Sequence, residues 1–234
     1  MKAQTLALLA AARAARRPVA LVTRVGDGAQ ALVDAGSVDG ELALDAAAVA
    51  AVRAQLARAD SGTLEGDAGL FARCYVPPPR LLIVGAVHIG QALQAIATTV
   101  GYEVTVIDPR SGFAASQHFA RGEVVGDWPD EAMRRLAPDA GTAIVTLTHD
   151  PKLDDPALIA ALRSPAFYIG ALGSRRTHAQ RLARLQELGF GPELQRLHAP
   201  IGLDLGGRSA GDIAVAIMAE IIQVRCRPAP AQLS

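Results

Sequence analysis

From residue 80 to residue 226, short apolar runs alternate with longer segments in which apolar residues recur every three or four positions. The run "LLIVGAV" is followed by Ile89, Leu93, Ile96 and Val100, a spacing that predicts a helix after a strand. Later runs that predict strands are "EVTVIDP", "GEVVGD", "TAIVTLTHD" and "AFYIGALG". Helices are predicted at 129–136, 154–163 and 175–188 and in "SAGDIAVAIMAEIIQVR". This alternation predicts an α/β domain at 81–234, built as a Rossmann-like doubly wound parallel sheet.

The first 76 residues follow a different pattern, with strands grouped between two helices. The strands are predicted in "PVALVTRV", "GDGAQALVDAGSVDGELAL" and "GLFARCYV", after a short amphipathic helix near the start. Asp45 is expected to cap the helix in "DAAAVAAVRAQLARAD", and Ser209 and Asp212 have capping-box spacing in the last helix. We therefore expect a smaller α+β domain at 1–76 and a stiff proline linker at 77–80. The small domain has little core of its own, which favours a homo-oligomer.

Charge and cysteine content narrow the function classes. Lysine plus arginine equals aspartate plus glutamate at 23 each, so no net charge favours nucleic acid as a partner. The two cysteines, Cys74 and Cys226, are far apart, which fits a reducing cytoplasm better than a disulfide framework or a zinc site. The apolar start resembles a signal peptide, but Arg13, Arg16 and Arg17 stand where cleavage would occur. No apolar run is long enough to predict a membrane span.

Ligands of doubly wound sheets bind at the carboxyl ends of the strands, and glycines and ionisable residues gather after these strands. The first such loop, "GAVHIG", has Gly85 and Gly90 of a dinucleotide fingerprint, but Val87 replaces the middle glycine. The valine side chain disfavours a pyrophosphate in the usual pose, although the helix start at His88 still favours an anion. Next along the chain, Asp108 is spaced to receive ribose hydroxyls, or else to make a turn before a proline, with Arg110 beside it.

Two further loops carry more of the candidate chemistry. In "THDPKLDD", His149, Asp150, Asp154 and Asp155 lie in close order and suit a ligand or a divalent metal, although Asp155 before a proline could equally cap the next helix. In "LGSRR", a glycine, a hydroxyl and two guanidiniums at a helix start predict an anion site; these residues are Gly173, Ser174, Arg175 and Arg176. Asp204 lies among glycines in "PIGLDLGG". No catalytic base or nucleophile with its partners is recognisable in the sequence.

Six blocks in this order resemble the xanthine dehydrogenase accessory protein family (XdhC/CoxI): "GAVHIGQAL", "VTVIDPR", "LTHDPKLDDPAL", "YIGALGSRRT", "APIGLDLGG" and "DIAVAIMAEII". The resemblance implies a protein that binds molybdenum cofactor, a pterin phosphate, and helps its sulfurated form into a xanthine dehydrogenase-type molybdoenzyme. A cofactor-sulfurating enzyme is a second implied partner. The stretch "GSVDGELAL" matches a "GSVSGGCVE"-like segment of longer members, but this chain lacks the cysteine.

The leading hypothesis is therefore a cofactor chaperone without turnover of its own. It places the ligand against the loop residues named above: Gly85, His88, Gly90, Asp108, Arg110, His149, Asp150, Asp154, Gly173, Ser174, Arg175, Arg176 and Asp204. An NAD(P)-dependent oxidoreductase is the alternative that Asp108 favours and Val87 disfavours. A third possibility is a structural adaptor that docks on a dehydrogenase subunit.

Overall fold

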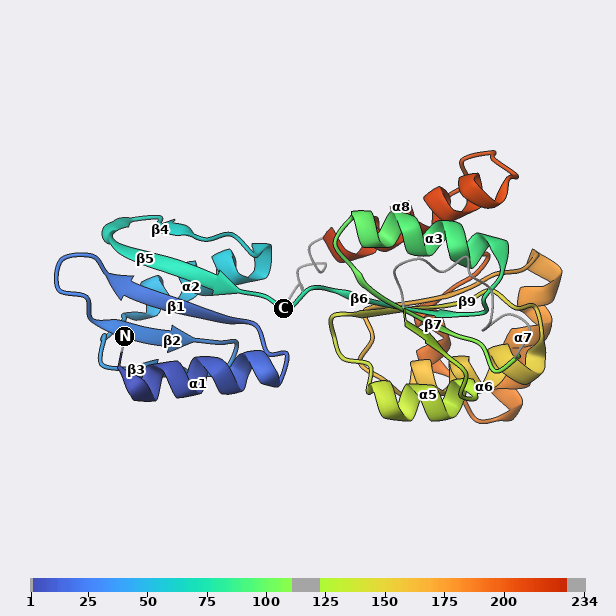
Figure 1. The fold of residues 1–234 in the computed structure, drawn as a ribbon, viewed down its shortest axis with the longest axis horizontal. Helices are drawn as coiled ribbons and strands as arrows, with labels where there is room; N and C mark the ends of the chain where they lie inside the picture. Colours follow the sequence, from blue (N-terminus) through green and yellow to red (C-terminus); the bar gives the residue numbers. More distant parts are fainter. Residues whose placement is uncertain (1, 111–122, 227–234) are drawn as a thin grey trace. The chain divides into compact units, whose positions relative to one another are not determined.

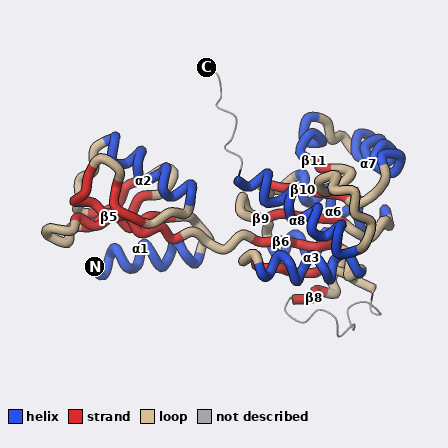
Figure 2. Tube along the Cα trace, turned by 90° about the horizontal axis from the view of Figure 1, so that it is seen from above, coloured by secondary structure: helices blue, strands red, loops and turns tan. Residues whose placement is uncertain are grey.

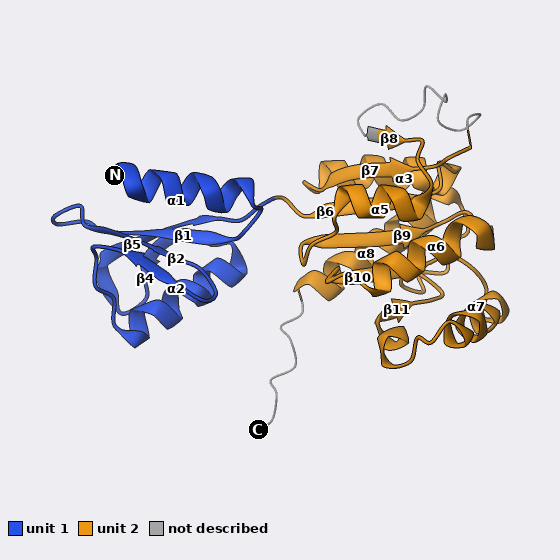
Figure 3. Ribbon diagram, turned by 90° about the horizontal axis from the view of Figure 1, so that it is seen from below, with its two compact units in different colours: residues 1–77 blue, residues 78–234 orange. Residues whose placement is uncertain are grey.

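The computed structural model describes residues 2–110 and 123–226. The chain divides into two compact units, 1–77 and 78–234, and the division falls within the run of prolines (Figure 3). In the described part of the chain, no helix is both long and apolar enough to cross a bilayer. Each unit has its own sheet and its own buried core, and each is described by itself.

Unit 1 is an antiparallel sheet between two helices, in the strand order β3-β2-β1-β5-β4 (Figure 3). Alternate residues of β1 point to opposite faces, so that Ala20 and Val22 pack toward α2 while Leu21 packs toward α1. The expected cap of α2 is confirmed, because the Asp45 carboxylate accepts a hydrogen bond of 2.7 Å from the Ala48 amide. The elements are α1 (Ala3–Ala14), β1 (Val19–Arg24), β2 (Gln30–Val33), β3 (Val38–Gly40), α2 (Ala46–Arg58), β4 (Gly62–Leu64) and β5 (Asp67–Tyr75).

Unit 2 contains a six-stranded sheet in the order β11-β10-β9-β6-β7-β8, and every strand pair in it is parallel. The predicted doubly wound parallel sheet is thus confirmed. Its strands are β6 (Arg80–Val84), β7 (Glu103–Ile107), β8 (Glu123–Val125), β9 (Thr142–Thr146), β10 (Tyr168–Ala171) and β11 (Leu197–His198). Its helices are α3 (His88–Thr99), α5 (Pro129–Leu136), α6 (Pro151–Leu162), α7 (Arg175–Glu187) and α8 (Ala210–Cys226), with a 3-10 helix at Pro192–Arg196.

The sheet of unit 2 is buried on both faces. Helices α3 and α8 cover one face and α5 and α6 cover the other, as Figures 1 and 2 show. Consecutive residues of β6 alternate between the two cores, with Leu81 and Ile83 on the α3–α8 side and Leu82 and Val84 on the α5–α6 side. This double burial explains why the strands appear in the sequence as continuous apolar runs rather than as alternating patterns.

The helix boundaries differ most from the sequence prediction at the start of α6. Helix α6 begins at Pro151 instead of residue 154, and Asp150 caps it by accepting from the Lys152 amide at 2.9 Å. The expectation that Asp155 caps this helix is wrong, because Pro151 already has the fixed backbone angle that suits a first helical position. Pro156 consequently lies inside the helix. The capping box of α8 is confirmed by reciprocal hydrogen bonds between Ser209 and Asp212, both 3.1 Å long.

Candidate functional site

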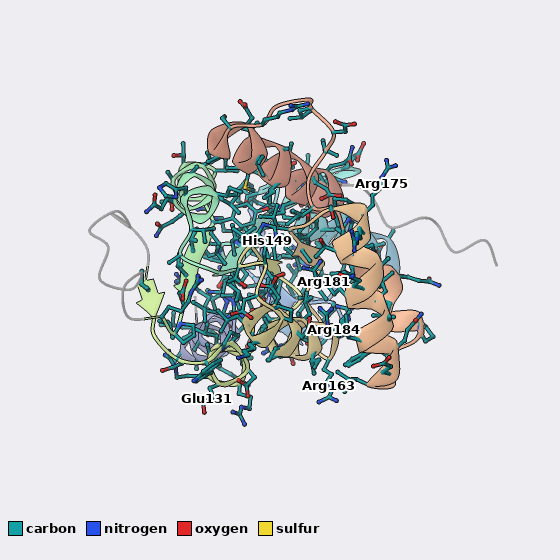
Figure 4. All side chains as sticks on the ribbon, turned by 90° about the vertical axis from the view of Figure 1, so that its right-hand side faces the viewer. Glu131, His149, Arg163, Arg175, Arg181 and Arg184 are labelled. Atoms are coloured by element: carbon teal, nitrogen blue, oxygen red, sulfur yellow. The ribbon has the colours of Figure 1, made fainter. Side chains whose placement is uncertain are left out.

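The strand order reverses between β6 and β9. From β6 the chain adds β7 and β8 on one side, and from β9 it adds β10 and β11 on the other. In open α/β sheets, ligands bind at the carboxyl ends of the strands beside such a reversal point. Figure 4 looks onto this edge of unit 2 and shows His149 near its centre. The candidate site is built from the loops of this edge.

The first loop runs from Gly85 into α3 and is packed tightly against the loop after β9. Gly85 has a φ of +115°, and a Cβ atom there would lie 2.8 Å from the Thr148 methyl group. A Cβ on Gly90 would lie 2.7 Å from the Gly85 carbonyl oxygen, so this glycine lets the helix approach the strand. Val87 is half-buried against the α3–α8 core, and the first residue of the helix, His88, is exposed. The first amides of a helix have no acceptor within the helix, and in α3 no side chain caps them either.

Asp108, at the end of β7, is completely buried and already bonded through both carboxylate oxygens. One oxygen accepts from the Ala86 amide at 2.8 Å, and Arg110 donates to both oxygens, at 2.8 Å from Nε and 2.7 Å from Nη2. Burial opposes ionisation, but the hydrogen bonds from Arg110 and Ala86 outweigh it and lower the pKa of Asp108. In this arrangement Asp108 fixes the first loop, and its oxygens do not face a ribose.

His149 is the exposed residue of the loop after β9 and has a left-handed backbone, with φ of +60°. A non-glycine residue in this region is strained by about 1–3 kcal/mol and needs surrounding structure to hold it. The neighbours on both sides supply that structure. The Thr148 hydroxyl accepts from the Asp150 amide at 3.0 Å, and the Asp150 carboxylate is fixed as the cap of α6. The exposed imidazole is thus presented at the carboxyl edge of the sheet by a loop that is held on either side.

Asp154 lies beneath this loop rather than in it. It is buried, accepts a 2.7 Å hydrogen bond from the Thr148 hydroxyl, and forms a long ion pair of 3.5 Å with Arg181 of α7. Burial raises the pKa of Asp154 despite the hydrogen bond from Thr148 and the charge of Arg181. Neither Thr148 nor Arg181 is among the site residues predicted from the sequence. Arg181 was recognisable in principle, since it lies four residues before Leu185 on the buried face of α7.

The loop after β10 leads into α7 through Gly173, whose φ is +146°. Ser174 caps the helix by accepting from the Thr177 amide at 3.2 Å. Arg175 and Arg176 follow, and both are exposed and without an ion pair among the described residues. The amides of the two arginines belong to the first turn and have no acceptor within the helix. This helix start therefore has the donors and the charge of an anion site.

The last loop, before α8, is fastened by a cluster that the sequence did not reveal. Glu220 accepts from the Tyr168 hydroxyl at 2.6 Å and from the Gly202 amide at 2.7 Å, and it contacts His198 at 3.1 Å. Burial opposes ionisation, but the contacts with His198, Tyr168 and Gly202 lower the pKa of Glu220. Asp204 in the same loop is exposed and makes no hydrogen bond or ion pair with the described residues.

The structure joins most of the predicted residues through direct contacts. The loop after β6 meets the loop after β9 at Gly85 and Thr148, and Asp108 at the end of β7 is bonded to the loop after β6. Arg181 connects the loop after β9 with the loop after β10 through Asp154 and the Leu172 carbonyl group. Asp204 stands outside this set of contacts. Within residues 2–110 and 123–226, no three His, Cys, Asp or Glu side chains are grouped so as to hold a metal ion.

The parallel strand order, with helices on both faces of the sheet, defines unit 2 as a Rossmann-type domain. Residues 81–221 match the family described as the XdhC Rossmann domain, and the chain belongs to this family. The family resemblance expected from the six sequence blocks is confirmed.

Curated relatives include the molybdenum cofactor insertion chaperone PaoD of Escherichia coli K12, which is 33% identical over 150 residues, 64% of this chain and 41% of that protein. A probable xanthine dehydrogenase subunit of Bacillus subtilis 168 is 30% identical over 161 residues, 68% of this chain and 47% of its own length. The chain thus spans less than half the length of either relative. A solved structure described as a xanthine dehydrogenase from Bacillus halodurans shares the fold, with a TM-score of 0.70 and 24% identity over 94% of this chain and 66% of that one.

Proposed function

We propose that this protein is an accessory protein of molybdoenzyme maturation. It binds molybdenum cofactor at the carboxyl edge of the parallel sheet and assists the sulfuration of the cofactor and its insertion into a xanthine dehydrogenase-type enzyme. The observation that carries the proposal is the family match over residues 81–221, together with a 33% identical relative named as a molybdenum cofactor insertion chaperone.

The residues at this edge fit a phosphorylated pterin. Two helix starts offer free amides, two exposed arginines offer charge for a phosphate, and His149 offers an imidazole in the middle of the edge. The carboxylates of Asp108 and Asp154 are buried and paired with Arg110 and Arg181, so neither is exposed at the surface of this edge. His88, Arg175, Arg176 and His149 are the side chains that we assign to direct contact with the ligand.

The sulfur chemistry is assigned to a partner enzyme rather than to this chain. Cys74 is half-buried in β5, and its thiol donates to the Asp60 carbonyl oxygen at 3.1 Å. Burial, and next the charge of Asp60, raise the pKa of the Cys74 thiol, which lowers its thiolate fraction at neutral pH. A cofactor-sulfurating enzyme and a molybdoenzyme client are therefore the proposed partners, and self-association of the chain is proposed with them.

Nicotinamide dinucleotide binding is the competing function. The position of Asp108 at the end of the second strand of this sheet favours it, because dinucleotide-binding domains place a ribose-binding acid there. Both oxygens of this carboxylate are already occupied by Ala86 and Arg110. Val87 remains where the fingerprint has a glycine. We therefore rank the cofactor chaperone first.

Isolation of the protein from a molybdenum-replete host tests the proposal. After gel filtration, pterin fluorescence and molybdenum are expected to elute with the protein. In the variant His149→Asn, asparagine tolerates the left-handed backbone but removes the imidazole. We expect this variant to retain about tenfold less cofactor, or less still, because one good polar contact is lost. Gln186→Ala, at an exposed position late in α7, is the control and is expected to retain it.

The competing function makes the opposite prediction. If neither the sulfurated nor the unsulfurated cofactor is retained above background, while NADH or NADPH quenches the fluorescence of Trp128, the chaperone proposal is wrong. Trp128 is the single tryptophan of the chain, and it lies in the loop after β8, at the same edge of the sheet.

A further inference from the structure

Helix α7 contains a buried arginine whose guanidinium is only partly paired. The Arg181 side chain is 2% exposed, and its Nη2 donates to the Leu172 carbonyl oxygen at 3.0 Å and approaches Asp154 at 3.5 Å. Its Nε and Nη1 are buried and have no hydrogen-bond partner among the described residues. Buried donors in native proteins are nearly always bonded, so two unbonded donors on one cation require an explanation.

The unpaired end of this guanidinium lies against the loop that starts α7. Nη1 is 3.8 Å from the point where a Cβ atom of Gly173 would be, and Nη2 holds the carbonyl group of the preceding residue. The free amides of Arg175 and Arg176 begin the helix directly after this loop. Figure 4 labels Arg181 and Arg175 on α7, with Arg175 at the start of the helix. The buried cation and the exposed helix start are therefore parts of one region.

The acidic groups nearby do not cancel the positive charge. Asp154 meets Arg181 only at the long distance of 3.5 Å, at the limit of hydrogen bonding. Asp155 is paired with Arg184 at 2.6 Å. The pKa of His178, on the same helix, is lowered by burial and next by the charge of Arg181. A positive potential consequently remains at this helix start, and the low polarity of the interior strengthens it.

We propose that the loop from Gly173 to Arg176, with Arg181 beneath it, is an anion subsite that takes the phosphomonoester group of the ligand. This inference rests on the proposed function for the identity of the ligand, but the subsite itself is defined by its chemistry. In this subsite the amides of the helix start and the exposed side chains of Arg175 and Arg176 bind the phosphate, and the buried Arg181 adds positive charge beside Gly173. We place the phosphate at the start of α7 rather than at the start of α3, because the charged group beneath the α3 loop is the carboxylate of Asp108.

Titration of the full chain with inorganic phosphate, followed by amide chemical shifts, tests the subsite. Saturable shifts are expected at Ser174, Arg175 and Arg176, and none at His88, Ile89 and Gly90. Arg181→Met, which keeps much of the volume and removes the charge, is expected to weaken phosphate binding by about tenfold or more, the usual effect of losing a charged interaction. Arg181→Lys is expected to restore most of the lost affinity, an outcome that a purely structural role would not produce.

A second variant keeps the test decisive if Arg181→Met does not fold. The double change Arg175→Ala and Arg176→Ala removes two exposed side chains and is expected to weaken phosphate binding by a similar factor. The matched control, Arg58→Ala with Arg73→Ala, removes two exposed arginines from unit 1 and is expected to leave it unchanged. Equal weakening by the control, or saturable shifts at residues 88–90 instead, overturns the subsite.

The outcomes for subsite and function are separable. If the protein retains molybdenum cofactor but phosphate shifts the amides of α3, the subsite proposal is wrong and the proposed function stands. If phosphate shifts the amides of residues 174–176 but the protein retains no cofactor, the subsite proposal stands and the proposed function is wrong.

Discussion

Helices α3 and α7 start at the same edge of the same sheet, and their starts are built alike. Each follows a buried strand, and each is preceded by a glycine with positive φ, +115° at Gly85 and +146° at Gly173. Each offers first-turn amides without acceptors in the helix. On backbone geometry alone, both helix starts would favour an anion equally.

The two starts differ in the charge buried beneath them. Under the α3 loop lies the carboxylate of Asp108, which consumes the Ala86 amide and draws in Arg110. Under the α7 loop lies the guanidinium of Arg181, with two nitrogens unpaired among the described residues. A buried charge acts through a medium of low polarity, so its sign outweighs the partial charge of a helix end. The glycine pattern of a turn therefore says less about its ligand than the charged residue under it.

The largest expected effect concerns the packing that holds the α3 turn. Gly90→Ala places a methyl group 2.7 Å from the Gly85 carbonyl oxygen, a backbone atom that cannot move away without shifting the helix. We expect a loss of about 3 kcal/mol in the free energy of unfolding of unit 2, as for other overpacked sites. Urea unfolding followed by Trp128 fluorescence measures it, since the only tryptophan lies in this unit.

Gly211→Ala is the control for this change. Gly211 is an exposed helical glycine whose added Cβ would meet its nearest atom at 3.8 Å. Alanine there is expected to stabilise unit 2 by up to about 1 kcal/mol through its helix propensity. An unfolding curve for Gly90→Ala that matches this control would show that the α3 turn has room for a methyl group.

A smaller loss of stability is expected from removing the negative charge of Asp108 beneath the α3 loop. Asp108→Asn keeps an acceptor for the Ala86 amide but loses the charge that Arg110 binds, at a cost of about 2 kcal/mol at neutral pH. Because the pKa of Asp108 is lowered by folding, the stabilisation exists above the ordinary value of 3.8 and disappears as the pH falls through the lowered value. Unfolding of wild type and variant by urea should therefore converge in acid. A difference that persists unchanged at low pH would contradict the charge-based role.

Asp154→Asn is expected to have the opposite pH dependence. The pKa of Asp154 is raised by burial, so above its ordinary value of 3.8 the unfolded chain loses the proton more readily than the folded one. Wild type should therefore lose stability relative to the variant as the pH rises from that value through the raised pKa. The difference at neutral pH is expected to stay within about 1 kcal/mol, because the variant keeps the hydrogen bond from Thr148 and loses only a long ion pair. If stability depends on pH in the same way in the Asp108→Asn and Asp154→Asn variants, the expected opposite pH dependence of the two carboxylates is wrong.

The sequence predicted the fold because its signals are repeated many times along the chain. The apolar runs of β6, β7, β9 and β10 are separated by amphipathic helices, and the caps at Asp45 and Ser209 mark helix starts by local chemistry alone. Strands of two or three residues, β4 and β11, were not predicted, since so few residues have no period to detect. Both Pro151 and Pro156 suit the first turn of a helix, and the prediction of a start near Pro156 was wrong because α6 begins at Pro151.

The site was predicted only where loop chemistry is local. Gly173 and Ser174 indicate a helix start from two adjacent residues, and His149 closely follows a buried strand. The supports beneath them are long-range, as in the pairing of Asp154 with Arg181, 27 residues apart. The cluster of Tyr168, His198 and Glu220 spans up to 52 residues. Such contacts depend on which strands become neighbours, and that is settled by the packing of the whole sheet.

The smallest effect is expected from restoring the missing glycine of the fingerprint. Val87→Gly loses packing against the α3–α8 core but places a better residue at the N-cap of α3, for a net cost of about 0.5 kcal/mol. If the middle glycine were all that the dinucleotide site lacked, this variant would gain binding of NADH. We expect no quenching of Trp128 by NADH in either protein, because the oxygens of Asp108 stay bonded to Ala86 and Arg110 and offer nothing to a ribose. Saturable quenching in the variant alone would show that the valine, and not the buried charge beneath the turn, decides what the first loop binds.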